Sequence, residues 1–311
     1  MISTMQGHAA SEAPDPTAGF ERALARTGRL PHAARLLGGL VVADLLVRLW
    51  IVPLGAPGPA SLGTLFSLAA GPLMLLVPAA VYARWPDAAR TRRVLLAGAL
   101  LGAAAELFAL LWLFVGTAVY AHARSPAAAT ALEPDSVVVE LTLVVTGVAG
   151  TGLVAAALLR GVGSWALEAA RRPITAIAIA GGAIALGQMA AALLGPASRA
   201  PGPGSGTGLA PWTPALAVGL GALAWAAVAA AGLAGRASTR EPVWTLVLLA
   251  ACARLGIHAI GIATEAIGVQ VPLVAALAFV AAVFGVAAPT LLAVAFARAP
   301  EGFAARRPSS A

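Results

Sequence analysis

The most informative segment of this chain is Glu241–Gly268, with the sequence EPVWTLVLLAACARLGIHAIGIATEAIG. It is apolar and long enough to cross a bilayer, yet it contains Arg254, His258 and Glu265. On a helix these three side chains lie within roughly 40° of one another, with Gly261 on the same line, and the line climbs roughly 16 Å. Because an ionisable group in lipid costs several kcal/mol, such a line should face protein or water. The stretch therefore predicts a membrane-spanning helix with a candidate site along one face.

The composition of the whole chain is that of a membrane protein. Of its 311 residues 60% are hydrophobic and 11% are charged, whereas soluble domains average about 25% charged residues. The mean hydropathy is +0.89. The chain has no lysine, which excludes a Schiff base with retinal or pyridoxal phosphate and a Walker-type phosphate loop. Its amino-acid usage indicates a GC-rich bacterial genome, so we expect it in the bacterial cytoplasmic (inner) membrane.

The sequence also restricts cofactor chemistry. Cys252 is the single cysteine, which excludes an internal disulfide, an iron–sulfur site and a cysteine zinc site. Only His258 lies well inside a predicted span, which argues against a haem held by two histidines of this chain. We therefore expect no metal and no cofactor within the chain, with quinone or quinol as a possible substrate. The net charge of +7 has a topological explanation, so we expect no nucleic-acid partner.

The hydropathy pattern predicts an all-α, polytopic bundle of eight transmembrane helices over residues 33–297. Residues 1–32 are predicted to be a polar cytoplasmic leader, in which Thr17–Arg29 is compatible with a short interfacial helix or a disordered tail. Residues 298–311 form a basic cytoplasmic tail, and Arg160–Arg172 is predicted to be a loop. Pro72 and Pro78 predict kinks in the second span. The spans are about Ala33–Leu54, Ala60–Ala83, Val94–Ala121, Ser136–Leu159, Pro173–Gly195, Trp212–Gly235, Glu241–Gly268 and Val271–Ala297.

The distribution of arginine predicts the orientation of these spans. With eight spans, sixteen of the twenty arginines lie in the termini and loops of one side. The loops of the other side contain two, Arg124 and Arg199. Because cytoplasmic loops carry an excess of Lys and Arg, both termini are predicted to be cytoplasmic.

Polar side chains from several spans are predicted to lie inside the bilayer. Four carboxyl groups face two arginines and one histidine, so the set is neutral only if a carboxyl is protonated or an imidazole is charged. Burial and nearby cations tune carboxyl groups in this way at proton-handling sites. The substrate or proton site candidates are Arg254, His258, Glu265, Asp44, Arg48 and Glu106, with Glu140 and Gln188 as peripheral candidates and no catalytic residue. The predicted topology places Asp44, Glu106, Arg254 and His258 near the middle of the bilayer and the other four toward its outer half.

A structural role for the same residues stays open. Asp44 and Arg48 are four residues apart, and the pair can neutralise itself on one helix. Arg254 with Glu106 or Asp44 can act as an interhelical clamp that holds the bundle together. A pair of glycines four residues apart, Gly98 and Gly102, predicts close helix packing.

Several short motifs, in order across residues 36–268, resemble the haem-free membrane subunits of polysulfide-reductase-type complexes, the NrfD/PsrC-like family. Asp44-Leu45 is followed by Arg48, and Ser61-Leu62-Gly63 matches the Ser-x-Gly that opens the family's next helix. The small-residue helix with Thr146-Gly147 and the late arginine, Arg254, also have counterparts. The Gly-Arg-Pro that follows Asp-Leu in the family and its Gly-rich first span are absent here, and an extra span follows Arg254.

The resemblance implies a quinol-binding membrane partner of iron–sulfur and molybdenum subunits, with no cofactor of its own. The first expectation is accordingly a cofactor-free quinol-interacting or proton-conducting membrane subunit of an electron-transfer complex. Its partners would be the lipid bilayer and iron–sulfur or other redox subunits. The alternatives are a transporter or permease for a small solute or ion, for which buried charges are equally natural, and a membrane scaffold or assembly protein. The sequence does not decide whether the protein is an enzyme.

Overall fold

The computed structural model describes residues 38–49, 62–84, 90–122, 136–194, 212–239, 241–267 and 271–298. Within these ranges the chain forms helices and no strand. An apolar segment in lipid must satisfy its backbone N–H and C=O groups internally, and a helix does so within one segment. The predicted all-α class therefore holds throughout the described chain.

Six of the described helices are long and apolar enough to cross a bilayer. They correspond to the last six predicted spans and identify a multi-pass membrane protein. Of the first predicted span the structure describes residues 38–49, which are helical, and the predicted leader lies outside the described residues. The six helices are α5 (Arg90–His122), α7 (Ser136–Val162), α9 (Arg171–Leu194), α10 (Trp212–Thr239), α11 (Pro242–Ile267) and α12 (Val271–Arg298).

The second predicted span is a broken helix. It consists of α3 (Leu62–Met74) and α4 (Leu76–Arg84), which are separated at Leu75. Pro72 and Pro78 have no N–H group, so the carbonyls four residues before them lack their helical donor. At the break, the N–H of Leu75 donates to the carbonyl of Pro72 at 3.1 Å, which is the tighter spacing of a turn. The two predicted kinks thus combine into one interruption.

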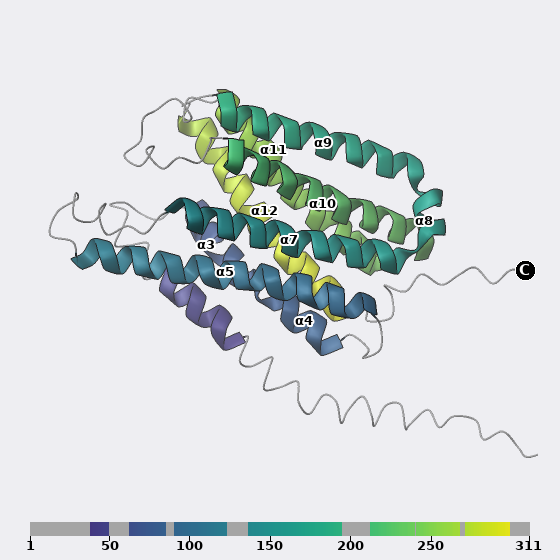
Figure 1. Ribbon diagram of the computed structural model, residues 1–311, viewed down its shortest axis with the longest axis horizontal. Coiled ribbons are helices and arrows are strands. Elements are labelled where there is room, and N and C mark those ends of the chain that lie inside the picture. The colour runs from purple at the N-terminus through teal and green to yellow at the C-terminus, as the bar shows by residue number, and fades with distance from the viewer. Residues whose placement is uncertain are drawn as a thin grey trace, which may run out of the picture.

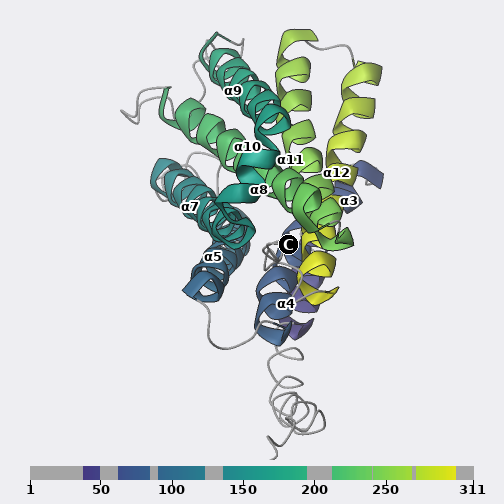
Figure 2. The same ribbon diagram turned by 90° about the vertical axis from the view of Figure 1, so that its right-hand side faces the viewer.

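The segment predicted as a loop between the fourth and fifth spans contains a short helix. This helix, α8 (Ser164–Ala169), crosses the end of the bundle between α7 and α9 (Figure 2). It starts after Gly163, whose φ of 83° is a conformation that glycine adopts without strain. The loop prediction was wrong here, because α7 continues to Val162 and α9 begins at Arg171, and the polar residues Ser164 and Glu168 are part of the short helix between them.

Most of the described helices form a ring, and its interior contains the buried charged residues predicted from the sequence. Consecutive members of this ring are in contact: α5 packs on α7, α7 on α10, α10 on α11 and α11 on α12. α12 contacts α3 and α4, and α4 returns to α5, which closes the ring (Figure 2). α9 lies outside and packs on α10 and α11. The ring brings spans that are distant in sequence, such as α5 and α11, to two sides of one interior.

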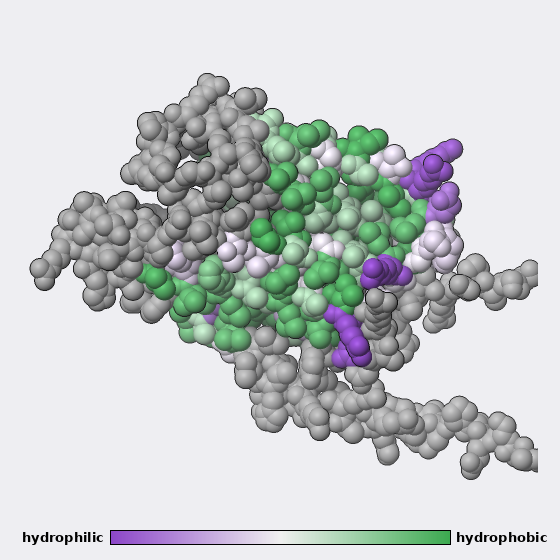
Figure 3. Space-filling view, viewed as in Figure 1, coloured by the Kyte–Doolittle hydropathy of each residue, from purple (hydrophilic) through white to green (hydrophobic). Residues whose placement is uncertain are grey.

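The main hydrophobic core fills the end of the ring where α8 lies. It includes Leu95 near the start of α5, Leu158 near the end of α7, and Trp244 and Phe296, each no more than 2% exposed. The exposed arginines of the described chain gather beyond it, where purple side chains mark the α8 end of an otherwise apolar surface (Figures 1 and 3). These arginines are Arg93, Arg160, Arg171, Arg172 and Arg236.

Helices α5 and α7 approach closely enough for backbone contact. A methyl group at Gly98 would lie 2.7 Å from the carbonyl oxygen of Gly150, and one at Gly150 would lie 2.9 Å from the backbone nitrogen of Gly102. The close packing predicted from the Gly98–Gly102 spacing is confirmed, with a partner glycine in the small-residue run of α7. Small residues let helices associate in lipid, where hydrophobic burial does not drive them together.

This contact makes a stability prediction. Gly98→Ala should destabilise the protein by about 1–3 kcal/mol, because the backbone of α7 cannot yield to the added methyl group as a flexible side chain would. The matched control is Gly152→Ala on α7, where a methyl group would meet nothing within 4 Å. Melting temperatures in detergent should therefore fall for Gly98→Ala and hold for Gly152→Ala. Equal melting of the two variants would contradict the packing.

Candidate functional site

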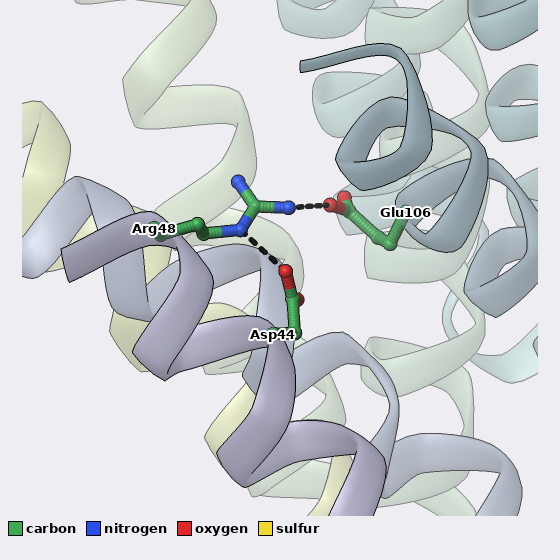
Figure 4. Close-up of polar contacts among 3 residues, drawn as sticks. All are labelled: Asp44, Arg48 and Glu106. Carbon is green, nitrogen blue, oxygen red and sulfur yellow. Dashed lines mark hydrogen bonds and ion pairs between the residues drawn. The ribbon is translucent and has the colours of Figure 1, made fainter. Parts of the chain in front are cut away.

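An intrahelical ion pair forms the first part of the candidate site. Nε of Arg48 donates to Oδ1 of Asp44 at 2.8 Å, across one turn of the helix of residues 38–49 (Figure 4). Asp44 is 1% exposed and is the buried charged side chain of the described core. The self-neutralising pair predicted from the sequence is therefore confirmed, although it is not isolated.

Arg48 also reaches a second helix. Its Nη2 lies 3.8 Å from Oε2 of Glu106 on α5 (Figure 4). α3 approaches the same place through Gly71, where a methyl group would lie 2.7 Å from Nη2 of Arg48 and 2.8 Å from Oε2 of Glu106. The broken helix thus contacts this ion pair at Gly71, three residues before α3 ends at Met74. Any side chain at Gly71 would displace one of the two charged groups.

Arg254 on α11 lies near enough to Glu106 for their opposite charges to attract each other. The charges of Arg48 and Glu106 act on each other in the same way. The guanidinium of Arg254 also lies 5.6 Å from the centre of the Trp225 ring on α10, a cation–π contact. We refer to Asp44, Arg48, Glu106 and Arg254 as the charge cluster; with both carboxyl groups ionised its net charge is zero.

The charge cluster is incompletely hydrogen-bonded. Oδ2 of Asp44, Nη2 of Arg48 and Nε of Arg254 are buried and have no hydrogen-bond partner among the described residues. Leaving a buried charged group unpaired costs more than an unmade neutral hydrogen bond. The arrangement therefore has two guanidinium N–H donors and one carboxylate oxygen available to bind a proton carrier or a polar ligand.

His258 belongs to a second contact, one turn from Arg254. Its Nδ1 lies 2.7 Å from Oε1 of Gln188 on α9, and Nε2 of Gln188 donates to the backbone carbonyl of His258 at 3.1 Å. The amide must present its NH₂ to that carbonyl, so its oxygen faces Nδ1, which must carry the hydrogen. Nε2 of His258 is then the acceptor of the neutral ring, and it faces α10 near Gly221.

The structure brings most of the sequence-predicted residues together. Asp44, Arg48, Glu106 and Arg254 share one interior, while His258 and Gln188 pair beside it. Gln188, predicted as peripheral, binds His258 through two hydrogen bonds. The side chains of Glu140 and Glu265 lie outside the described part of the structure, and those two predictions stay predictions.

Two residues of the site were missed by reasoning from the sequence. Trp225 lies in the middle of α10 among small and aliphatic residues, and a tryptophan in the middle of a span is a signal for a packed or polar partner. Gly71 precedes Pro72, but nothing in the sequence indicates that its missing side chain makes room for an ion pair from two other helices.

No family model matches the chain, and no curated protein or solved structure was found to be similar to it.

Proposed function

We propose that the protein is a proton-coupled transporter of a small solute, and that Glu106 carries the coupled proton. The observation that carries this proposal is the position of Glu106 near two arginines, Arg48 at 3.8 Å and Arg254, inside a membrane bundle. Besides Asp44, Glu106 is the member of the cluster that can change its charge, because arginine stays protonated in proteins. Glu106 is 30% exposed against 1% for Asp44, so Glu106 is the less enclosed of the two carboxyl groups.

The broken helix supports transport over a purely structural role. Discontinuous membrane helices commonly line transport sites, because their interrupted turns present free backbone groups and can move as halves. Here the interruption at Leu75 lies one turn from Gly71, which touches the Arg48–Glu106 pair. A clamp that only held helices together would also be expected to satisfy its buried donors, and this one leaves two guanidinium nitrogens without a hydrogen bond among the described residues.

The position of the hydrophobic core supports a site that opens toward one side. The main hydrophobic core includes Ala251 of α11, one turn before Arg254, and Ala99 of α5, two turns before Glu106. This apolar layer separates the charge cluster from the α8 end. The proposal includes eight spans, both termini in the cytoplasm and the bacterial inner membrane, which would make the arginine-rich α8 end cytoplasmic and the cluster accessible from outside.

A quinol-interacting subunit of an electron-transfer complex is the second candidate. One observation favours it: Asp44, Arg48 and Arg254, which carry the resemblance to polysulfide-reductase-type membrane subunits, belong to one cluster. Purification from native membranes, with extraction of quinones and mass spectrometry of co-purifying proteins, distinguishes the two. Stoichiometric quinone and an iron–sulfur partner would favour the subunit over the transporter.

The proton on Glu106 can be observed directly. In reconstituted membranes, lowering the pH should produce the infrared C=O stretch of a carboxylic acid, and Glu106→Gln should remove it. Glu168→Gln is the matched control, because Glu168 is 77% exposed beside Arg171 at the α8 end. This variant should keep the C=O stretch of protonated Glu106. The proposal fails if wild-type protein and Glu106→Gln give the same spectrum over about pH 5–8.

A further inference from the structure

The charge balance of the cluster limits what it can bind. Asp44 and Arg48 neutralise each other through their 2.8 Å hydrogen bond. The charged groups near Glu106 in the described chain are Arg48, which lies 3.8 Å away, Arg254, and Asp44, which bonds Arg48. When Glu106 takes up a proton, the cluster changes from net zero to net +1. A buried net charge is unfavourable, so the cluster with protonated Glu106 is stabilised by binding one negative charge.

The donors for that charge are already in place. Nη2 of Arg48 and Nε of Arg254 are buried N–H groups without a hydrogen-bond partner in the described chain, and they belong to two different helices near Glu106. Guanidinium groups match the geometry of a carboxylate, and charge-assisted bonds of this kind are about twice as strong as neutral ones. Gly71 adds no side chain on the α3 side, and a methyl group at Gly102, one turn before Glu106, would meet nothing within 4 Å.

We propose that the charge cluster binds a small monovalent carboxylate between Arg48 and Arg254 while Glu106 carries one proton. The inference rests on the proposed function and supplies its substrate class. A proton from water adds to the carboxylate of Glu106, and the ligand's carboxylate replaces it as the acceptor of the two guanidinium groups. The cluster stays neutral before and after. A divalent carboxylate would leave one negative charge uncompensated, and a neutral amide would leave the positive charge unpaired.

Lactate and acetate are suitable probes, with lactamide and acetamide as neutral analogues. Calorimetric titration of purified protein should show saturable lactate binding whose affinity rises about tenfold for each unit of pH decrease, because one proton accompanies each anion. Glu106→Gln imitates the protonated carboxyl, so its lactate affinity should be high and independent of pH. Arg48→Gln should weaken binding by about 10- to 100-fold, the effect of one charged hydrogen bond.

Cys252→Ser is the control for these variants, because Cys252 is exposed on α11 two residues from Arg254. The Cys252→Ser protein should bind lactate as the wild type does. A second measurement requires no variant: wild-type protein in weak buffer with a pH dye should take up one proton per lactate bound.

Several outcomes would overturn the inference. These are no saturable lactate or acetate binding, equal binding of lactamide, binding without proton uptake, or pH-dependent binding that persists in Glu106→Gln. If the infrared band of Glu106 is nevertheless present, proton handling stands and only the anion is refuted. If the band is absent, the proposed function itself fails.

Discussion

Replacing Arg254 with glutamine is expected to abolish lactate-linked proton uptake and to make the stability of the protein depend strongly on pH. Glutamine keeps hydrogen-bond donors near Glu106 but removes the positive charge. Asp44, Arg48 and Glu106 then have a net charge of −1 in the interior of the bundle. Removing one partner of a buried charge pair typically costs about 3–5 kcal/mol, because the other charge is left without compensation.

Protonation of Glu106 can relieve that charge, which gives the prediction its sign. The melting temperature of Arg254→Gln should approach that of wild type at low pH and fall below it as the pH rises. The cation–π contact with Trp225 is lost at every pH, at a cost of about 0.5–2 kcal/mol. Cys252→Ser should show neither the activity loss nor the pH dependence. Normal stability and normal activity of Arg254→Gln would refute both the binding role and the clamp.

Exchanging Asp44 and Arg48 is expected to have the second-largest effect. If the two residues only neutralised each other, the double variant Asp44→Arg with Arg48→Asp would keep the ion pair and the stability. In the structure, however, Nη2 of Arg48 also faces Glu106 at 3.8 Å. The exchange places a second carboxylate beside Glu106 and moves the guanidinium one turn away. We expect a loss of about 3–5 kcal/mol and no anion-linked proton uptake.

The chain offers a matched control for this exchange. Glu168 and Arg171 form a 3.7 Å ion pair at the α8 end, with both side chains more than three-quarters exposed. Exchanging them should change stability by no more than about 0.5 kcal/mol, because exposed ion pairs contribute little. Melting temperature and proton uptake measured on both exchanges separate the hypotheses. If the Asp44–Arg48 exchange behaved like the surface exchange, Asp44 and Arg48 would have no role beyond their own pair.

The predicted spans agree with the structure where the signal is local. Length and hydropathy located α5, α7, α9, α10, α11 and α12, because each segment in lipid must form its own backbone hydrogen bonds. The Asp44–Arg48 pair was also predictable, since residues four apart on one helix are neighbours whatever the fold. The Gly98–Gly102 spacing predicted close packing for a similar reason, although it did not name Gly150 as the partner.

The site was predictable as a set of residues and not as an arrangement. Depth in the bilayer suggested Glu106 or Asp44 as the partner of Arg254, and the structure distinguishes them: Asp44 bonds Arg48, and Glu106 lies near both arginines. The pairing of His258 with Gln188 joins residues seventy positions apart. Neither follows from periodicity, because which helices are neighbours depends on how the ring closes.

The amino-acid sequence was sufficient to predict that the chain spans a membrane, which segments form its long helices, and that charged side chains within them must face one another or water. Those properties follow from the cost of exposing backbone and charge to lipid, which each segment meets separately. Only the structure shows that Gly71 and Trp225 border the charge cluster, that Gln188 sets the tautomer of His258, and that two guanidinium nitrogens have no hydrogen bond within the described chain. These depend on contacts between α3, α5, α10 and α11, and distances across a helix ring depend on the packing of every member at once.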